Sequence, residues 1–178
     1  TYADNGQVYA ITGNQIWNFE NGIFNLIYQG SYEHRYEAIA SRPNQGFVIA
    51  ESMGSQFLFF SAFGSPPTES WSLLPLRASP MAFHQGGFVF PNDNRIYRQA
   101  SSTDVQVFAG TGEVGDQNGN VLQAKFRSPS GVASDGSGNV FVSEVSGHRI
   151  RKISSVGIVS TLAGTGSRGW LDGIGESA

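Results

Sequence analysis

The sequence contains no cysteine and only two lysines, Lys125 and Lys152. Without cysteine, a disulfide framework and a thiolate metal site are both excluded, while the redox compartment stays open. Lysine and arginine number 11 against 14 acidic residues, which gives a net charge of -3. Because affinity for a phosphate backbone needs a large basic field, we expect no nucleic acid as the main partner.

Long apolar runs are absent as well. No run approaches the roughly 18 residues that cross a bilayer, so we expect no membrane insertion. Charged residues make up only 14% of the chain, whereas glycine contributes 23 of its 178 residues. This composition is typical of short strands joined by tight turns.

Two internal similarities dominate the sequence. Residues 107–112 (Val-Phe-Ala-Gly-Thr-Gly) recur as residues 161–166 (Thr-Leu-Ala-Gly-Thr-Gly), an offset of 54, and the match continues without a gap. Residues 46–51 (Gly-Phe-Val-Ile-Ala-Glu) lie over residues 139–144 (Asn-Val-Phe-Val-Ser-Glu), an offset of 93. Fixed offsets of a few tens of residues indicate a solenoid or a propeller.

Each unit alternates apolar runs of four to six residues with turn residues. The best preserved unit predicts strands over 131–134, 139–143, 148–153 and 158–163, separated by turns rich in Gly, Ser and Asp. Four antiparallel strands are the content of a propeller blade. We therefore predict an all-β protein, a β-propeller of four-stranded antiparallel blades.

Several segments resemble the NHL repeat: residues 129–133 (Pro-Ser-Gly-Val-Ala), 138–142 (Gly-Asn-Val-Phe-Val), 147–153 (Gly-His-Arg-Ile-Arg-Lys-Ile) and 161–164 (Thr-Leu-Ala-Gly). Gly147-His148-Arg149-Ile150 stands at the Asn-His-Leu signature that names the repeat. The Gly-rich connection over 110–124 is similar to the blade-to-blade loops of extracellular members. The close match covers Val107 to Ala178, and the resemblance favours an extracellular or cell-surface setting.

We expect about four blades, an incomplete one over 1–30 and others over 31–75, 76–110 and 111–164, with 165–178 beginning a further blade. Unpaired strands at both ends would expose edges. We therefore expect part of a larger propeller, with six blades as one option and closure through another copy as the other.

The loops supply the candidate binding residues. Asp116-Gln-Asn-Gly-Asn120 resembles the start of a calcium loop, but no Glu stands at the twelfth position, so turn chemistry is the favoured interpretation. In the second copy of this loop Trp170 replaces Asp116, and Asp172 replaces Asn118. Trp170 either anchors a partner or packs beneath its own loop.

Charged residues at the strands give further candidates. Arg149 and Arg151 alternate around Ile150, so their guanidinium groups either pair with acids or face an anionic ligand. Glu51 and Glu144 are equivalent under the offset of 93 and are interpreted as turn or blade-packing residues rather than as a catalytic pair. No metal site is predicted; His34 and His84 would be the candidates if a metal bound on the propeller axis, and His148 at the signature position is interpreted as structural.

These observations favour a non-enzymatic binding or assembly scaffold that presents blade loops to a protein partner, other copies included, or to a glycan. A metal-dependent lyase or hydrolase on the same fold is the alternative, and RNA binding, found in tripartite-motif relatives, is the third. No cofactor and no catalytic residue is predicted. Fold alone does not choose among these functions.

Overall fold

The computed structural model describes residues 8–12, 14–21, 23–29, 36–42, 46–51, 56–60, 69–72, 80–170 and 172–177. These residues form antiparallel β-sheets and one short 3-10 helix, η1 (Gly175–Ser177). The all-β class predicted from the sequence is therefore confirmed. No helix in this described part of the chain is long and apolar enough to cross a bilayer.

The described strands form four sheets, and in the first three of them successive strands pair with one another. The first sheet contains β1 (Val8–Thr12), β2 (Gln15–Glu20) and β3 (Ile23–Gln29). The second contains β4 (Tyr36–Arg42), β5 (Gly46–Glu51), β6 (Gln56–Phe60) and β7 (Glu69–Ser72). The third contains β8 (Ala82–His84), β9 (Gly87–Asn92), β10 (Arg95–Gln99) and β11 (Val105–Ala109). The fourth contains β13 (Pro129–Ser134), β14 (Val140–Glu144), β15 (Arg149–Ile153) and β16 (Ile158–Ala163), with the short strand β12 (Gly119–Asn120) added beside β16.

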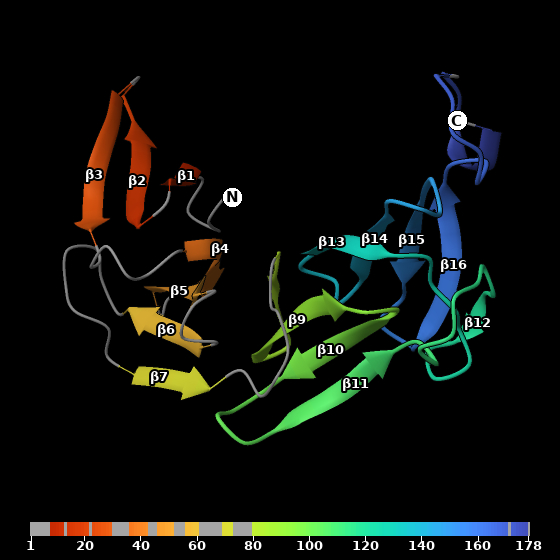
Figure 1. Cartoon of the computed structure of the whole chain (residues 1–178), viewed down its shortest axis with the longest axis horizontal. Helices are drawn as coiled ribbons and strands as arrows, with labels where there is room; N and C mark the ends of the chain where they lie inside the picture. The colour runs from red at the N-terminus through yellow and green to blue at the C-terminus, as the bar shows by residue number, and fades with distance from the viewer. Residues whose placement is uncertain are drawn as a thin grey trace.

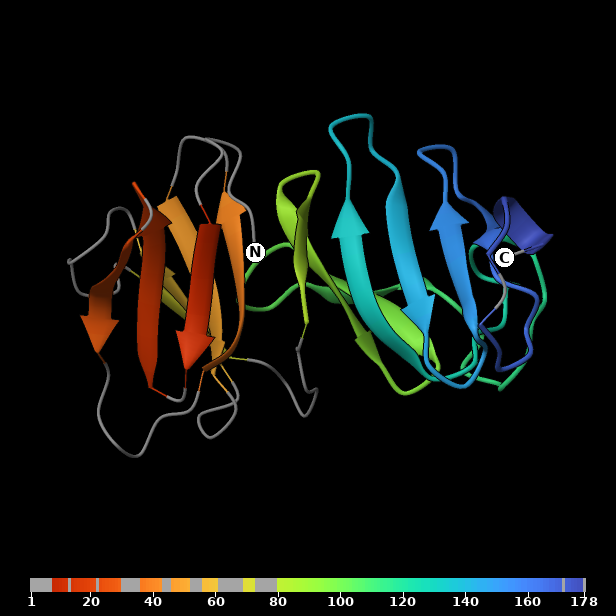
Figure 2. The ribbon, with the colours of Figure 1, turned by 90° about the horizontal axis from the view of Figure 1, so that it is seen from above.

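The four sheets follow one another along an open arc, with the first and the fourth at its two ends (Figures 1 and 2). Their strands fall within the ranges predicted from the sequence. The exact blade boundaries and the further blade expected from residue 165 stay predictions. The sequence did not predict β12, which lies in the connection between the third and fourth sheets.

The offset of 54 is reproduced in main-chain and side-chain contacts. Gly110 donates its N–H to Val121 O over 2.7 Å, and 54 residues later Gly164 donates to Gly175 O over 3.1 Å. Arg95 donates through Nη2 to Thr111 O (2.5 Å), and Arg149 donates in the same way to Thr165 O (3.3 Å). The two copies are therefore similar in structure as well as in sequence.

The offset of 93 is reproduced in strand register. Tyr36 pairs with Glu51 and the register then shifts before Ala38. Pro129 pairs with Glu144 and the register shifts before Gly131. Both acidic residues thus end the second strand of their sheets beside the same irregularity, as their alignment predicted.

The turn between β13 and β14 shows how local sequence sets a hairpin. Asp135 Oδ1 accepts the N–H groups of Ser137 (2.9 Å) and Asn139 (2.8 Å), which satisfies two donors of the turn. The side chain of Asn139 also donates to this carboxylate and is the largest cause of the lowered pKa of Asp135; the two main-chain bonds lower it further. Gly138 adopts φ +80, a conformation that side chains disfavour.

Hydrophobic residues gather between consecutive sheets. A cluster between the first and second sheets includes Ile16, Ile49 and Leu58. A larger cluster fills the joint between the third and fourth sheets, and its buried members are Val89, Ile96, Ala109, Ala124, Phe126, Val140, Val142, Ile153 and Val159. Burial of apolar area of this kind is the main stabilising contribution in a stack of sheets.

Candidate binding site

The joint between the third and fourth sheets contains a buried ion pair. Arg151 Nη1 lies 3.3 Å from Glu144 Oε1, and both side chains are fully buried. The two residues come from neighbouring strands, β15 and β14. A buried pair is tolerated only where further hydrogen bonds satisfy the remaining atoms, and Arg151 has several.

Arg151 holds the connection that crosses from the third sheet to the fourth. Its guanidinium group donates to Lys125 O (3.0 Å), to Gln117 O (3.2 Å) and to Asn118 Oδ1 (2.6 Å). It also lies 5.3 Å from the ring centroid of Phe126, a cation-π geometry. Because Arg151 is buried, we do not count it among the residues that touch a partner.

Glu144 connects the ion pair to the main chain of the segment that precedes β13. Its Oε1 accepts the N–H of Arg127 over 2.7 Å, while its Oε2 is buried without a hydrogen-bond partner. Burial raises the pKa of Glu144 above its ordinary value, against the lowering effects of the Arg127 N–H and the Arg151 charge. The turn after β14 folds closely over this carboxylate, since a Cβ at Gly147 would lie 2.7 Å from Oε2. Glu144 is thus buried between the turn that follows β14 and the segment that precedes β13, which agrees with its interpretation as a turn or blade-packing residue.

Asp116 at the tip of loop 110–124 binds two arginines. Its Oδ1 accepts from Arg127 Nε over 2.5 Å, and its Oδ2 lies 3.3 Å from Arg149 Nη1. The hydrogen bond from Arg127 is the largest cause of the lowered pKa of Asp116. Asn118, whose side-chain oxygen is a second potential ligand in the calcium-like sequence, accepts a hydrogen bond from Arg151 through that oxygen. The loop is thus held by guanidinium groups.

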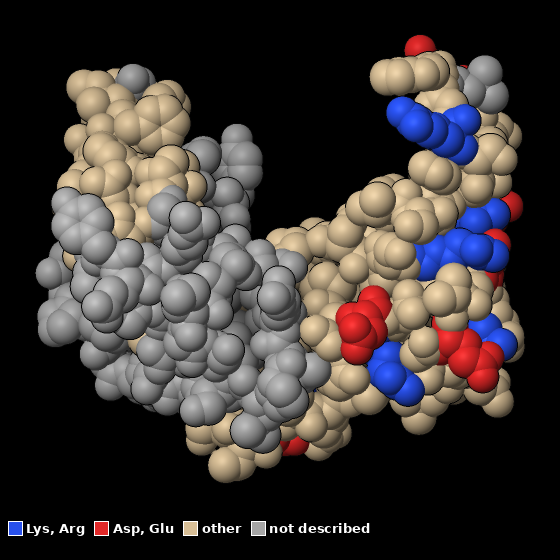
Figure 3. All heavy atoms as spheres, in the orientation of Figure 1, with Lys and Arg blue, Asp and Glu red and all other residues tan. Residues whose placement is uncertain are grey.

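Basic and acidic side chains also alternate over the C-terminal half of the chain on the face shown in Figure 3. A further pair, partly exposed at Lys125, joins Lys125 Nζ to Glu113 Oε2 over 2.5 Å. Its hydrogen bond lowers the pKa of Glu113. Such exposed pairs add little stability but leave a surface of mixed sign.

Loop 164–177, the second copy, differs from the first at the same positions. Trp170, the counterpart of Asp116, is 97% exposed, and Ile174 is 93% exposed. The alternative that Trp170 packs beneath its own loop is therefore wrong. Asp172 is exposed on the same loop. The hydrogen bond from Gly164 N–H to Gly175 O joins the two ends of the loop, and Trp170 and Ile174 lie between these ends.

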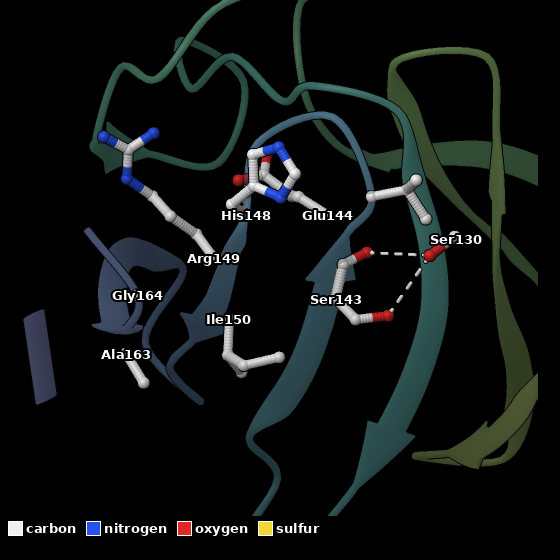
Figure 4. A pocket seen from close by; sticks show the side chains of 9 residues that line it. Ser130, Ser143, Glu144, His148, Arg149, Ile150, Ala163 and Gly164 are labelled. Atoms are coloured by element: carbon white, nitrogen blue, oxygen red, sulfur yellow. Dashed lines mark hydrogen bonds between the residues drawn. The ribbon is translucent and has the colours of Figure 1, made fainter. Parts of the chain in front are cut away.

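A groove opens on the outer face of the fourth sheet, the face turned away from the third (Figure 4). Its volume is about 440 Å³, within the range of small-ligand sites. Ser130 donates to Ser143 O (3.4 Å) and lies 3.3 Å from Ser143 Oγ along the groove floor. The groove is lined by Ser130, Ser143, Glu144, Val145, His148, Arg149, Ile150, Ala163 and Gly164.

Sequence reasoning selected Arg149 but missed the groove that it borders. Ser143, Ile150 and Ala163 form a row across β14, β15 and β16. The repeat offset could have drawn attention to Ile150 and Ala163, because it aligns them with the identical residues Ile96 and Ala109. The row itself needs the strand register, which the sequence does not contain.

The two histidines in the described part of the chain belong to different sheets, His84 to β8 of the third and His148 to the turn directly before β15 of the fourth. His84 is 4% exposed and its ring centroid lies 5.2 Å from that of Phe108. Burial is the largest cause of its lowered pKa, followed by the charge of Arg98. His148, with φ +47, lies at the rim of the groove. His34 lies outside the described residues, which contain no group of three or more potential metal ligands. The metal-dependent alternative thus stays a prediction.

The model of the NHL repeat matches residues 126–153. This segment runs from Phe126 in the joint to the end of β15, so the resemblance seen in the sequence is confirmed here. Teneurin-3 of Mus musculus is 38% identical over an alignment of 90 residues that covers 42% of this chain and 3% of Teneurin-3.

Solved β-propellers match nearly the whole chain. A protein of unknown function from Bacteroides thetaiotaomicron covers 92% of this chain with a TM-score of 0.74 and 20% identity, over 46% of its own length. An auxiliary nutrient binding protein from the same species covers 92% with a TM-score of 0.65 and 12% identity, over 46% of its length. Virginiamycin B lyase from Staphylococcus aureus covers 90% with a TM-score of 0.57 and 17% identity, over 53% of its length. The propeller fold is confirmed, and the chain spans about half the length of these proteins.

Proposed function

Starting from the NHL repeat at residues 126–153 and the propeller fold, we propose that this protein is a non-enzymatic binding scaffold for a protein partner. The outer face of the fourth sheet and loop 164–177 together form the proposed contact surface. The observation that carries the proposal is the contrast between two copies of one loop. Asp116 in the first copy is bound by two arginines, whereas Trp170 in the second is 97% exposed.

An exposed tryptophan is a typical anchor of a protein interface. Trp contributes large apolar area and is enriched among the residues that carry most of the binding energy. Ile174 on the same loop and Leu162 on β16, which are 93% and 44% exposed, are further exposed apolar side chains of this part of the chain. Contiguous exposed apolar area marks an interaction site, so these residues support a binding role if a partner contacts them together with Trp170.

The setting of this surface also supports a binding role. Arg149, bonded to Thr165 O at the base of the loop, supplies a guanidinium group at the rim of the groove. Asp172 adds a carboxylate on the loop itself. Apolar anchors surrounded by polar groups are the usual composition of a specific interface. Nutrient-binding proteins of Bacteroides show that a similar propeller serves binding in those proteins.

Selection from a random peptide library displayed on phage tests the proposal without a known partner. We expect the immobilised full chain to enrich related peptides, and Trp170→Ala to lower their capture at least tenfold. Val156→Ala is the matched control, because Val156 is an 82% exposed apolar residue on the turn between β15 and β16. Thermal unfolding should be unchanged in both variants, since exposed substitutions shift stability by at most about 0.5 kcal/mol.

A glycan array provides the complementary measurement. Binding of glycans without enrichment of any peptide would replace the protein partner by a glycan. Failure of both assays would overturn the binding function.

A further inference from the structure

The surface of the third sheet that the fourth sheet covers is equivalent, under the repeat, to the surface of the fourth sheet that forms the groove. In the third sheet, Ile96 pairs with Pro91 on β9 and with Ala109 on β11, and the register shifts directly after Ile96. In the fourth, Ile150 pairs with Ser143 on β14 and with Ala163 on β16, and the register shifts directly after Ile150. The two rows are therefore equivalent positions of the repeat.

The two rows differ in what covers them. All three residues of the row in the third sheet are buried, and Ile96 and Ala109 are fully inaccessible. In the fourth sheet, Ile150 is 37% exposed and the whole row borders the groove. The groove is thus the uncovered counterpart of a surface that, one repeat earlier, carries another sheet.

The residue that covers the third sheet is an aromatic one. Phe126, on the segment leading into β13, is fully buried in the same cluster as Ile96 and Ala109. It lies directly over Gly110, because a Cβ at that position would approach its ring to 3.0 Å. The counterpart of Gly110 is Gly164, which has the same φ of +97 and borders the groove.

A polar contact of the joint also has its counterpart. Ser128, two residues after Phe126, donates its N–H to Asn94 Oδ1 over 3.3 Å. The position equivalent to Asn94 is His148, which is exposed at the rim of the groove. An imidazole nitrogen can accept a main-chain N–H as the Asn oxygen does. In addition, Glu144, whose Oε2 is buried and without a hydrogen-bond partner, is one of the residues that line the groove.

We propose that the groove is a docking site for the leading segment of another propeller blade, whose aromatic residue lies over Gly164 and Ile150 as Phe126 lies over Gly110 and Ile96. This inference rests on the proposed function and specifies the chemistry of the partner. That chemistry is an extended segment with an aromatic side chain and, two residues later, a free main-chain N–H.

The chain provides its own probe, a synthetic peptide with the sequence of residues 121–132 (Val-Leu-Gln-Ala-Lys-Phe-Arg-Ser-Pro-Ser-Gly-Val). Fluorescence anisotropy of the labelled peptide would measure its binding to the full chain. We expect saturable binding that weakens at least tenfold when the peptide carries Phe126→Ala. Ile150→Lys in the protein should weaken binding to a similar extent, because it places a charge on the groove floor.

Val156→Lys is the matched control in the protein, since it adds the same charge to an exposed apolar position at the other end of the sheet. Equal binding of the Phe and Ala peptides, or no saturable binding up to millimolar peptide, would overturn the inference. It would also be overturned if the unliganded protein self-associates in sedimentation velocity, Ile150→Lys dissociates it and the peptide does not compete. The occupant would then be a second copy. Enrichment from the random library together with failure of this peptide would leave the proposed function standing.

Discussion

Replacing Arg151 by methionine would remove the buried cation that binds the connection between the third and fourth sheets to the fourth sheet. Loss of one member of a buried ion pair typically costs about 3–5 kcal/mol, because the other charge stays buried. Gln117 and Asn118, two of the acceptors that would lose Arg151, are exposed and can be rehydrated. The penalty therefore falls mainly on Glu144, and we expect a loss of about 3 kcal/mol in the free energy of unfolding at pH 7.

The pH dependence separates this electrostatic cost from a simple packing defect. Burial already raises the pKa of Glu144, and removal of Arg151 takes away a charge that lowers it. A carboxyl whose pKa is raised by folding destabilises the folded state as pH rises through the folded pKa. The difference between wild type and Arg151→Met should therefore be largest at pH 7 and shrink as pH falls toward 4.5, the ordinary value for Glu.

Urea denaturation followed by tryptophan fluorescence at several pH values would measure both effects. The double variant Glu144→Gln with Arg151→Met is the control, because it removes both charges and should recover part of the lost stability. A loss below about 0.5 kcal/mol at pH 7, the usual effect of a surface substitution, would refute the reasoning. So would a loss that is the same at every pH.

Three further variants test the joint and its loop by urea denaturation. Gly110→Ala should lower the free energy of unfolding by about 1–3 kcal/mol, because Gly110 has a φ of +97 and a Cβ there would contact Asn94 O. The control Gly136→Ala, where a Cβ would meet nothing within 4 Å, should change it by at most about 0.5 kcal/mol. Equal losses in the two variants would contradict backbone strain at Gly110. Phe126→Ala should cost about 3–5 kcal/mol as a fully buried aromatic, and a cost below about 1 kcal/mol would show that the ring does not hold the joint. Asp116→Asn should be less stable than wild type above pH 3.8, and the difference should vanish as pH falls through the lowered pKa of Asp116; a difference independent of pH would assign it to something other than the ion pairs.

The fold was predictable because each repeat carries its own strand and turn signals. The offsets of 54 and 93 aligned residues that the structure places at equivalent positions, down to the bulges beside Glu51 and Glu144. Strand limits in the fourth sheet differ from the prediction by two residues at most. Local alternation of apolar and turn residues contains this information.

The site was less predictable because its contacts join distant parts of the chain. The alternation of Arg149 and Arg151 around Ile150 was visible, but not that Arg151 would bind Lys125 O and Asn118 Oδ1, which lie 26 and 33 residues earlier. Trp170 was selected, yet its exposure depends on what packs against the loop. The groove requires the register of three strands, and no local signal encodes that register.

The two-residue strand β12 covers part of the outer edge of the fourth sheet. Gly119 and Asn120 occupy the outer edge of β16 beside Val159 and Ile158, and Gly175 of η1 accepts a hydrogen bond from Gly164 just after β16 ends. An uncovered outer strand would invite growth of the sheet by strand addition, the first step of many aggregates. Because both ends of this strand are shielded, the proposed docking is left to the broad face of the sheet, where side chains and not main-chain ladders would decide which partner fits.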